Sequence, residues 1–302
     1  MKLPVFSILI TTKNRLHDLK ITLSKINYLI NNENLECIIC DDGSNDGTYD
    51  FLKENYPKIQ LLRNVKSLGL IASRNRLLNL TIAKYAISLD DDAHIITPDP
   101  LPIISGYFEN NSKCGVIALR IFWGKILSEN YATNEKSLRV KGFVGCGHVW
   151  NMDAWRDIPK YPEWFIFYGE EDFAAYQLFR KKWQVHYVPD VLVQHRVEVK
   201  DRKKEADYAI RLRRSLRAGW YNYFLFFPWS LIPRRFFYTL FVQFRLKLFK
   251  GDLKSTLAIF QALLDLILHL PKLMKNRNSL SISEFKELEN LSETKIYWKE
   301  GN

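Results

Sequence analysis

The sequence predicts an α/β protein with a mostly parallel central sheet covered by helices, followed by a basic, aromatic helical part. Three observations point to this. Short apolar runs alternate with helical patterns over residues 5–89, polar clusters follow several of those runs, and positive charge gathers beyond residue 200. The chain has 302 residues, of which 47% are hydrophobic and 25% charged, which is typical of a folded chain with a large core.

The hydrophobic pattern predicts each N-terminal element in turn. Apolar, β-branched runs bounded by polar turns predict strands, and apolar residues at helical spacing predict helices. The predicted strands are residues 5–11, 36–40, 59–64 and 85–89. The predicted helices between them are residues 15–30, 48–56 and 71–85. Apolar strands that alternate with helices are typical of parallel sheets.

The pattern is looser after residue 101. A glycine-bearing stretch at residues 139–155 reads as strand, a helix follows the acidic cluster at residues 170–172, and residues 185–199 predict a pair of strands. Cys37 and Cys40 form a C-x-x-C inside the second predicted strand, and no second pair follows. We therefore expect them to pack in the core rather than to bind metal or form a disulfide.

Polar clusters follow the first, second and fourth predicted strands, at residues 11–15, 41–46 and 90–92. Ligands of open α/β sheets bind beyond the carboxyl ends of the strands, so three clusters at one edge indicate one site. Asp90 and Asp92 flank a single residue and would point to the same side of an extended strand end. Two such carboxylates suit Mg²⁺ or Mn²⁺, whose other positions water and phosphate oxygens fill. An aspartate-rich turn before a helix is the structural alternative.

Two further acidic clusters also have a structural and a functional interpretation. In "CDDGSNDGT" a carboxylate could accept hydrogen bonds from a base or ribose, or could only shape the turn. Glu170, Glu171 and Asp172 begin a predicted helix, where capping and the helix dipole favour acids. One of them could instead be a general base.

These stretches together resemble the family 2 glycosyltransferases, which have the nucleotide-sugar-binding GT-A fold. The resemblance covers roughly the first two-thirds of the chain. Six stretches occur in the family order: FSILITTKNR, CIICDDGSNDGT, NVKSLGLIASRN, ISLDDDAHI, FIFYGEEDFAAYQLFRKKW and YVPDVLVQH. The resemblance implies a metal-dependent, inverting transfer of a sugar from a nucleotide diphosphate to an acceptor hydroxyl, in a single displacement.

The resemblance also implies roles for individual residues. The divalent cation, Mn²⁺ or Mg²⁺, would be bound by Asp90, Asp92 and His195, although a single histidine at a strand end is often structural. Asp42 is favoured over Asp41 for the base and ribose. The residues expected at the donor nucleotide are Thr11, Asp41, Asp42, Arg74, Asp90 and Asp91.

The expected catalytic base lies in the Glu170–Asp172 cluster. The family commonly has E-D-x-D or E-E-x-D before the helix, whereas here Phe173 follows the three acids. Gapless matching through the helix places Glu171 at the base position, and a shift of one residue places Asp172 there. We prefer Glu171 and keep both as candidates. The altered motif also leaves open an alternative function, a catalytically inactive nucleotide-sugar-fold protein that acts as a scaffold at the membrane.

The basic region has its own explanation. Between residues 200 and 254 there are 14 lysines and arginines against 4 acids, in a chain whose net charge is +11. The longest uncharged run, residues 218–233, is shorter than the roughly 20 residues of a spanning helix. We expect interfacial helices on an anionic membrane surface. Packing on the catalytic part is the alternative; no nucleic acid is expected, because the aromatic residues lie in apolar runs without a recognisable binding module.

These features predict a catalytic domain over residues 1–200 and a helical extension over residues 201–302. The first residues contain too few apolar side chains for a signal peptide, so we expect a cytoplasmic protein, peripheral on the inner face of the cell membrane. Membrane association fits a glycan or glycolipid acceptor, such as a lipid-linked precursor of a cell-surface glycan. A UDP-sugar is the default donor, and a dTDP-sugar is possible.

Overall fold

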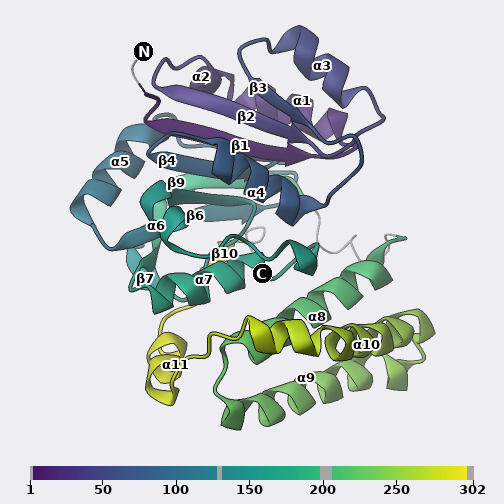
Figure 1. Ribbon diagram of the computed structural model, residues 1–302. Coiled ribbons are helices and arrows are strands. Elements are labelled where there is room, and N and C mark those ends of the chain that lie inside the picture. The colour runs from purple at the N-terminus through teal and green to yellow at the C-terminus, as the bar shows by residue number, and fades with distance from the viewer. Residues whose placement is uncertain (1–2, 128–130, 198–205, 298–302) are drawn as a thin grey trace.

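The computed structural model describes residues 3–127, 131–197 and 206–297, and shows a β-sheet with helices on both sides above a group of C-terminal helices (Figure 1). The strands are β1 (Phe6–Thr12), β2 (Leu35–Asp41), β3 (Gln60–Arg63), β4 (Tyr85–Asp90), β5 (Ala93–Ile95), β6 (Cys114–Trp123), β7 (Leu138–Val140), β8 (Gly147–Asn151), β9 (Gln184–His195) and β10 (Ile296–Tyr297). The helices are α1 (Leu16–Lys25), α2 (Asn27–Ile30), α3 (Thr48–Asn55), α4 (Leu70–Leu80), α5 (Pro100–Asn110), α6 (Met152–Asp157), α7 (Glu170–Arg180), α8 (Tyr208–Phe226), α9 (Ile232–Leu246), α10 (Leu253–Lys275) and α11 (Ile282–Glu289).

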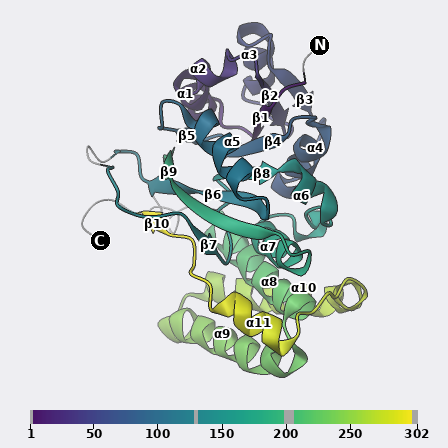
Figure 2. The same ribbon diagram turned by 90° about the vertical axis from the view of Figure 1, so that its left-hand side faces the viewer.

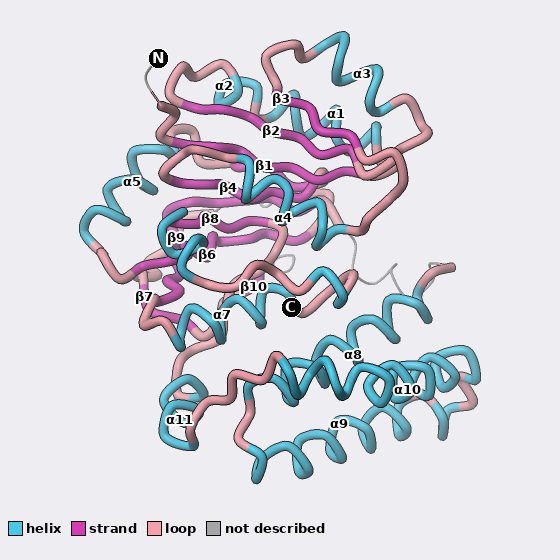
Figure 3. The backbone as a smooth tube through the Cα atoms, viewed as in Figure 1, coloured by secondary structure: helices cyan, strands magenta, loops and turns pink. Residues whose placement is uncertain are grey.

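The strands lie side by side in one sheet (Figure 3), which is parallel in its N-terminal half and mixed beyond it. Its order is β3-β2-β1-β4-β8-β6-β9-β5, with β7 paired to β9 and β10 to β6. The first four strands run parallel, as predicted. In contrast, β8 is antiparallel to β4 and β6, and β5 and β7 are antiparallel to β9. The predicted mostly parallel sheet is therefore corrected to a mixed one.

Three predicted elements have different bounds. The helix predicted over residues 71–85 ends at Leu80, because the backbone of Thr81 is already extended. The helix predicted over residues 15–30 is divided at Ile26 into α1 and α2. The strand pair predicted over residues 185–199 is one strand, β9, and residues 198 and 199 lie outside the described residues. A bulge explains the difference, since the pairing with β6 jumps from Val188 to Leu192.

The core has two layers, one on each face of the sheet. Along β1 the side chains alternate, so Ile8 and Ile10 pack with α1 and α5 while Leu9 packs with α4 and α6. Cys37 and Cys40 are buried and free, and they belong to opposite layers. Their predicted role in core packing is confirmed.

The C-terminal helices α8 and α10 pack in the same core layer as α4, α6 and α7. Phe226 of α8 stacks on Tyr176 of α7 with ring centroids 4.8 Å apart. Arg217 of α8 donates a hydrogen bond of 2.7 Å to the Phe165 carbonyl, just before α7. Beyond α11 the chain returns to the sheet, where β10 lies beside β6 (Figure 2). Part of the basic, aromatic region therefore packs on the catalytic part, as the alternative interpretation expected.

Candidate active site

The strand register brings the predicted polar clusters to one edge of the sheet. Thr11 of β1 pairs with Asp90 of β4 on one side and with Cys40, next to Asp41, on the other. At the same edge β9 ends at His195, which pairs with Ala93 of β5. Since β5 begins directly after the three aspartates, a histidine from late in the chain reaches them.

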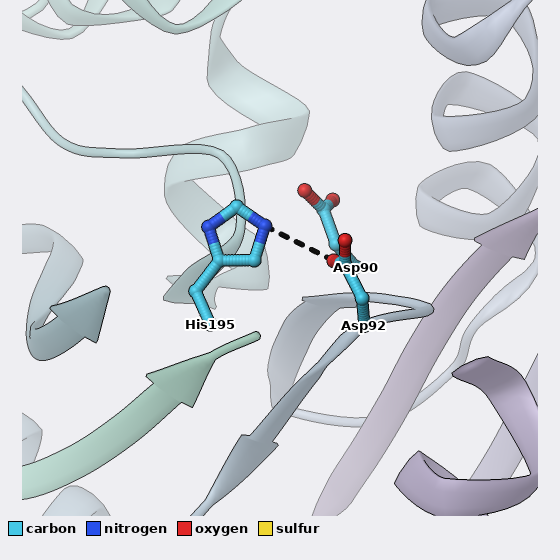
Figure 4. A group of neighbouring side chains, drawn as sticks. All are labelled: Asp90, Asp92 and His195. Atoms are coloured by element: carbon cyan, nitrogen blue, oxygen red, sulfur yellow. Dashed lines mark ion pairs between the residues drawn. The ribbon is translucent and has the colours of Figure 1, made fainter. Parts of the chain in front are cut away.

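Asp90, Asp92 and His195 form a group that could hold a metal ion (Figure 4). One ligand atom from each lies within 4.8 Å of the others. The His195 Nε2 atom is 3.0 Å from Asp92 Oδ1, and the imidazole packs edge-on against Trp123. Its Nδ1 atom is buried without a hydrogen-bond partner in the described parts of the chain. The two carboxylates suit Mn²⁺ or Mg²⁺, and the imidazole offers a third ligand atom, so the residues present fit a divalent cation.

The two aspartates in the turn differ in their protonation. Arg15 Nη2 lies 2.6 Å from Asp92 Oδ2, and Arg15 Nε lies 3.1 Å from Asp91 Oδ1. Burial opposes ionisation of Asp92, but the hydrogen bond and charge of His195, followed by the charge of Arg15, lower its pKa to about 2. Burial raises the pKa of Asp91 to about 8, and this carboxyl accepts a hydrogen bond of 2.8 Å from Thr12. Asp92 is thus ionised, which is the form of the carboxyl group that can bind a cation.

Asp42 organises the loop between β3 and α4. Its Oδ1 atom accepts hydrogen bonds from the Asn64 side chain (2.6 Å) and the Leu68 amide (2.8 Å). Its Oδ2 atom accepts from the Ser67 hydroxyl (2.6 Å) and the Gly69 amide (3.0 Å). Burial opposes the ionised form, but these hydrogen bonds lower the pKa of Asp42. Asp42 is therefore a carboxylate that already holds the rim of the site in place.

Asp41 faces away from this rim. It is fully buried, accepts a hydrogen bond of 2.9 Å from the Ser44 amide, and lies 3.8 Å from Arg63. Its environment is that of a residue that shapes the turn. The structure therefore favours Asp42 over Asp41 as a ligand-facing group.

A cleft of about 580 Å³ lies along this edge, a size suited to a small-molecule ligand. The predicted site residues that line it are Thr11, Asp42, Asp90, Asp91, Asp92 and His195. Ile166 and Phe167 line it from the loop before α7, and Arg211 and Arg214 line it from α8. The cleft thus lies between the sheet edge and the first helix of the extension.

Arg74 lies behind the cleft, where it joins three acids. Its Nη2 atom is 2.7 Å from Asp90 Oδ1, and its Nη1 atom is 2.7 Å from Glu170 Oε1 and 3.3 Å from Glu171 Oε1. Burial disfavours its charge, but the three carboxylates raise the pKa of Arg74 above its ordinary value. Arg74 also donates a hydrogen bond of 3.0 Å to the Gly145 carbonyl. It therefore connects the candidate metal ligand Asp90 to the acids that begin α7.

A family model described as Glycosyl transferase family 2 matches residues 7–176. The chain belongs to this family. No curated protein matches it in sequence. The solved structure of GalNAc-T7 with UDP, GalNAc and Mn²⁺ is similar at a TM-score of 0.56 and 15% identity, over 74% of this chain and 48% of that one. The mannosyltransferase PcManGT of Pyrobaculum calidifontis with GDP-Man and Mn²⁺ is similar at 0.54 and 14%, over 96% and 79%.

A third similar structure is TarS of S. aureus, at a TM-score of 0.58 and 14% identity, over 90% of this chain and 50% of that one. At these identities the likeness shows the fold, which is GT-A. The chain spans about half the length of the GalNAc-T7 and TarS chains.

Within the family's acidic motif the geometry separates the two candidate bases. Glu171 shares Arg74 with Asp90, and 21% of its side chain is exposed. Asp172 is exposed on α7 and makes no ion pair with Arg74. Glu170 is buried, and burial, followed by the charge of Glu171, raises its pKa to about 8. The structure therefore connects Glu171, rather than Asp172, through Arg74 to the candidate metal ligand Asp90.

The departure from the family motif at Phe173 has a packing explanation. Phe173 is buried, and its ring lies edge-on to Phe226 of α8 with centroids 5.4 Å apart. It also contacts Phe165, at 6.2 Å. An acid at this position would be buried in the aromatic core that holds the extension, so the phenylalanine serves this packing.

Sequence reasoning missed the contributions of Gly145, Arg211 and Arg214. A Cβ atom at Gly145 would lie 2.0 Å from Glu171 Oε1, so only glycine leaves room for this carboxylate. The two arginines belong to the "RLRRSLR" stretch, which the charge pattern pointed towards a membrane rather than the cleft. The available signal was their spacing of three residues, which puts both on one face of α8.

Proposed function

We propose that this chain is a metal-dependent, inverting glycosyltransferase that moves a sugar from a nucleotide diphosphate to an acceptor hydroxyl. A UDP-sugar is the default donor and a dTDP-sugar the alternative. One observation carries the proposal: Asp90, Asp92 and His195 line the same cleft as Asp42, and Arg74 connects Asp90 to Glu171. The similar structures of GalNAc-T7 and PcManGT contain a sugar nucleotide or UDP together with Mn²⁺.

The residues of the site divide the work. Asp90, Asp92 and His195 would hold Mn²⁺ or Mg²⁺, which when bound neutralises charge on the departing diphosphate. Thr11 and Asp42, at the rim of the cleft, would contact the base and ribose, with Asp91 beside them.

Proton transfer falls to the acids that begin α7. Glu171 removes the proton from the acceptor hydroxyl as its oxygen bonds to the anomeric carbon and the bond to the diphosphate breaks. A single displacement of this kind inverts the anomeric centre. Arg74 acts as a positioning residue, because it holds Glu171 and Asp90 in one arrangement.

A screen of nucleotide sugars with and without Mn²⁺ tests the proposal. A donor that binds the folded chain raises its melting temperature, by an amount that grows with concentration over Kd. We expect one donor to stabilise the chain in Mn²⁺ and to lose most of this effect in chelator, and transfer of its sugar to yield the inverted anomer by NMR. Binding without transfer to any glycan or glycolipid acceptor would favour the scaffold instead. No binding of any donor would contradict both.

We extend the proposal to the location of the enzyme, which we place on the cytoplasmic face of an anionic membrane with a lipid-linked glycan precursor as acceptor. Large apolar side chains are exposed on the outer face of α9 and α10, defined by Phe237, Tyr238, Phe241, Leu253, Leu257, Phe260, Leu264, Ile267 and Leu268. Exposed cations accompany this outer face at Arg234, Arg245, Lys250 and Lys254. Apolar side chains beside cations are the features of an interfacial helix.

Among the helices that the structure describes, α10 is the one long and apolar enough to cross a membrane by length and composition. However, 33% of its most apolar window is buried inside the molecule. Asp265 within it forms an ion pair of 2.6 Å with Arg213 of α8. These contacts favour an α10 that lies on the membrane surface through its outer face over one that crosses the membrane. We also propose that the helical extension begins near residue 200.

A further inference from the structure

Arg214 is a positively charged residue that lines the cleft without an ion-pair partner among the described residues of the sheet edge. It lines the cleft from α8, opposite the strand ends that carry Asp42 and Asp90. It is half-buried, and no hydrogen bond or ion pair joins its guanidinium to any part of the chain that the structure describes. Arg15 and Arg211, which also line the cleft, are paired with Asp92 and Asp207 at 2.6 and 2.8 Å.

Contacts of its neighbours on α8 fix the position of Arg214. One helical turn further along α8, Arg217 is buried and donates to the Phe165 carbonyl at 2.7 Å. Arg217 also lies 3.3 Å from Asp265 of α10. Asn222 donates a hydrogen bond of 3.0 Å to the Gly169 carbonyl, at the start of α7. These contacts hold α8 against the loop that lines the cleft, and Arg214 projects from the same side as Arg217.

The surroundings of Arg214 are unfavourable for a charge without a ligand. Burial and then the positive charge of Arg217 lower its pKa, and the more weakly acting charge of Asp207, which is already paired with Arg211, opposes them only in part. A half-buried cation without an ion pair of its own is costly unless an anion joins it. Arg214 is not part of the outer face proposed to contact the membrane. That face belongs to α9 and α10, whereas Arg214 lines the cleft from α8.

We propose that Arg214 binds the diphosphate of the donor nucleotide, so that the helical extension supplies one of the groups that stabilise the leaving group. This inference rests on the proposed function. When the bond between the anomeric carbon and the β-phosphate oxygen breaks, its electron pair stays on that oxygen. A guanidinium that is already in place stabilises this charge through two parallel hydrogen bonds. Asp90, Asp92 and His195 would hold the cation that neutralises the diphosphate at the sheet edge, and Arg214 would add a second positive charge from α8.

Calorimetric titration of the full chain in Mn²⁺ with UDP, GDP, dTDP and the matching nucleosides tests this. For the nucleoside diphosphate that binds the wild type best, R214Q should weaken binding by about tenfold or more, since hydrogen bonds between charged groups are strong. Nucleoside affinity should change less than about twofold, because the nucleoside has no phosphate. R214K, which keeps the charge but loses the fork, should lie between the two.

Stability provides a second readout. Without ligand, the melting temperature of R214Q should equal or exceed that of the wild type, because an unpaired cation is removed. K58Q, which removes an exposed cation outside the cleft, should leave diphosphate affinity unchanged. If R214Q binds the diphosphate as tightly as the wild type does, the inference is wrong. This holds even if R214Q raises the KM of a lipid-linked diphosphate acceptor, because Arg214 would then bind the acceptor and not the donor. Equal losses for diphosphate and nucleoside also overturn it. A wild type that binds no nucleotide defeats the proposed function itself.

Discussion

The substitution Gly145→Ala tests the catalytic geometry at a single atom. Gly145 lies in the loop before β8, and its backbone does not have the left-handed conformation that only glycine tolerates well. The added Cβ atom would lie 2.0 Å from Glu171 Oε1 and 2.8 Å from Arg74 Nη1. Both are side-chain atoms rather than backbone, and the overlap with the partly exposed Glu171 is far larger than that with Arg74, so the Glu171 carboxylate moves and the backbone remains in place.

The size of the effect follows from the distance. Real Cβ atoms almost never approach another heavy atom within 3.0 Å, so the Glu171 carboxylate must move by at least about 1 Å. A shift of about 1 Å in a reacting group can cost on the order of 100-fold in rate. Because Glu171 is partly exposed, its carboxylate can turn towards solvent, while Arg74 keeps Asp90 and Glu170. We therefore expect kcat to fall by about 100-fold with little loss of stability or donor affinity.

Steady-state kinetics with the donor found in the screen, together with the melting temperature, measures this. Gly142→Ala is the matched control, since a Cβ atom at Gly142 meets nothing within 4 Å. Gly142→Ala should keep kcat close to that of the wild type. If Gly145→Ala has the kcat of Gly142→Ala, Glu171 is not the base in the arrangement that the structure shows.

Three further predictions address the metal, the buried acid and the membrane. Asp92→Asn should make donor affinity nearly equal in Mn²⁺ and in chelator; a variant that keeps the Mn²⁺ dependence of the wild type would refute the metal site. Because the pKa of Glu170 is raised to about 8 from the usual 4.5, the folded chain keeps this proton where the unfolded chain loses it. The free energy of unfolding of the wild type should therefore fall relative to that of Glu170→Gln between about pH 4.5 and 8, by up to about 1.4 kcal/mol per unit, in denaturant titrations. Parallel pH curves for the two proteins would contradict this. The double substitution Leu257→Gln and Leu264→Gln should reduce sedimentation with anionic vesicles several-fold, because both side chains are exposed on α10. The control Ile82→Gln, at an exposed residue far from α10 in the sequence, should sediment like the wild type. Equal sedimentation of the wild type, the double variant and the control would rule out the outer face as the contact.

The parallel half of the sheet was predictable because its signals are local. Alternating strands and helices imply strand ends at one edge, and this pattern alone is enough to bring Thr11, Asp42 and Asp90 together. The antiparallel pairing of β8 depends on tertiary contacts between weakly patterned strands, so it could not be predicted. The bulge in β9 could not be recognised either, because its sequence looks like a turn between two strands.

The residues that gather at the candidate site could largely be predicted, whereas the contacts that connect them could not. The placement of His195 beside Asp92 came from the resemblance, because a contact between residues this far apart leaves no local pattern. Arg74 was expected at the nucleotide, yet it lies behind the cleft between Asp90 and the acids of α7. Whether Arg74 lines the cleft or lies behind it depends on its burial, and the sequence around a basic residue in a helix does not show how deeply it is buried. The role of Arg214 was hidden in the same way, by a charge pattern shared with membrane-binding helices.

The aromatic contact between Phe173 and Phe226 limits how this enzyme can be recombined with its relatives. Exchanging the C-terminal helices alone would set a foreign helix against Phe173 and leave the Phe165 carbonyl without the hydrogen bond from Arg217. A working hybrid would have to carry the segment around residues 165–173 along with the helices, and that segment contains the acids that we propose for proton transfer. The packing of the C-terminal helices and the acidic segment that begins α7 therefore have to be exchanged as one unit.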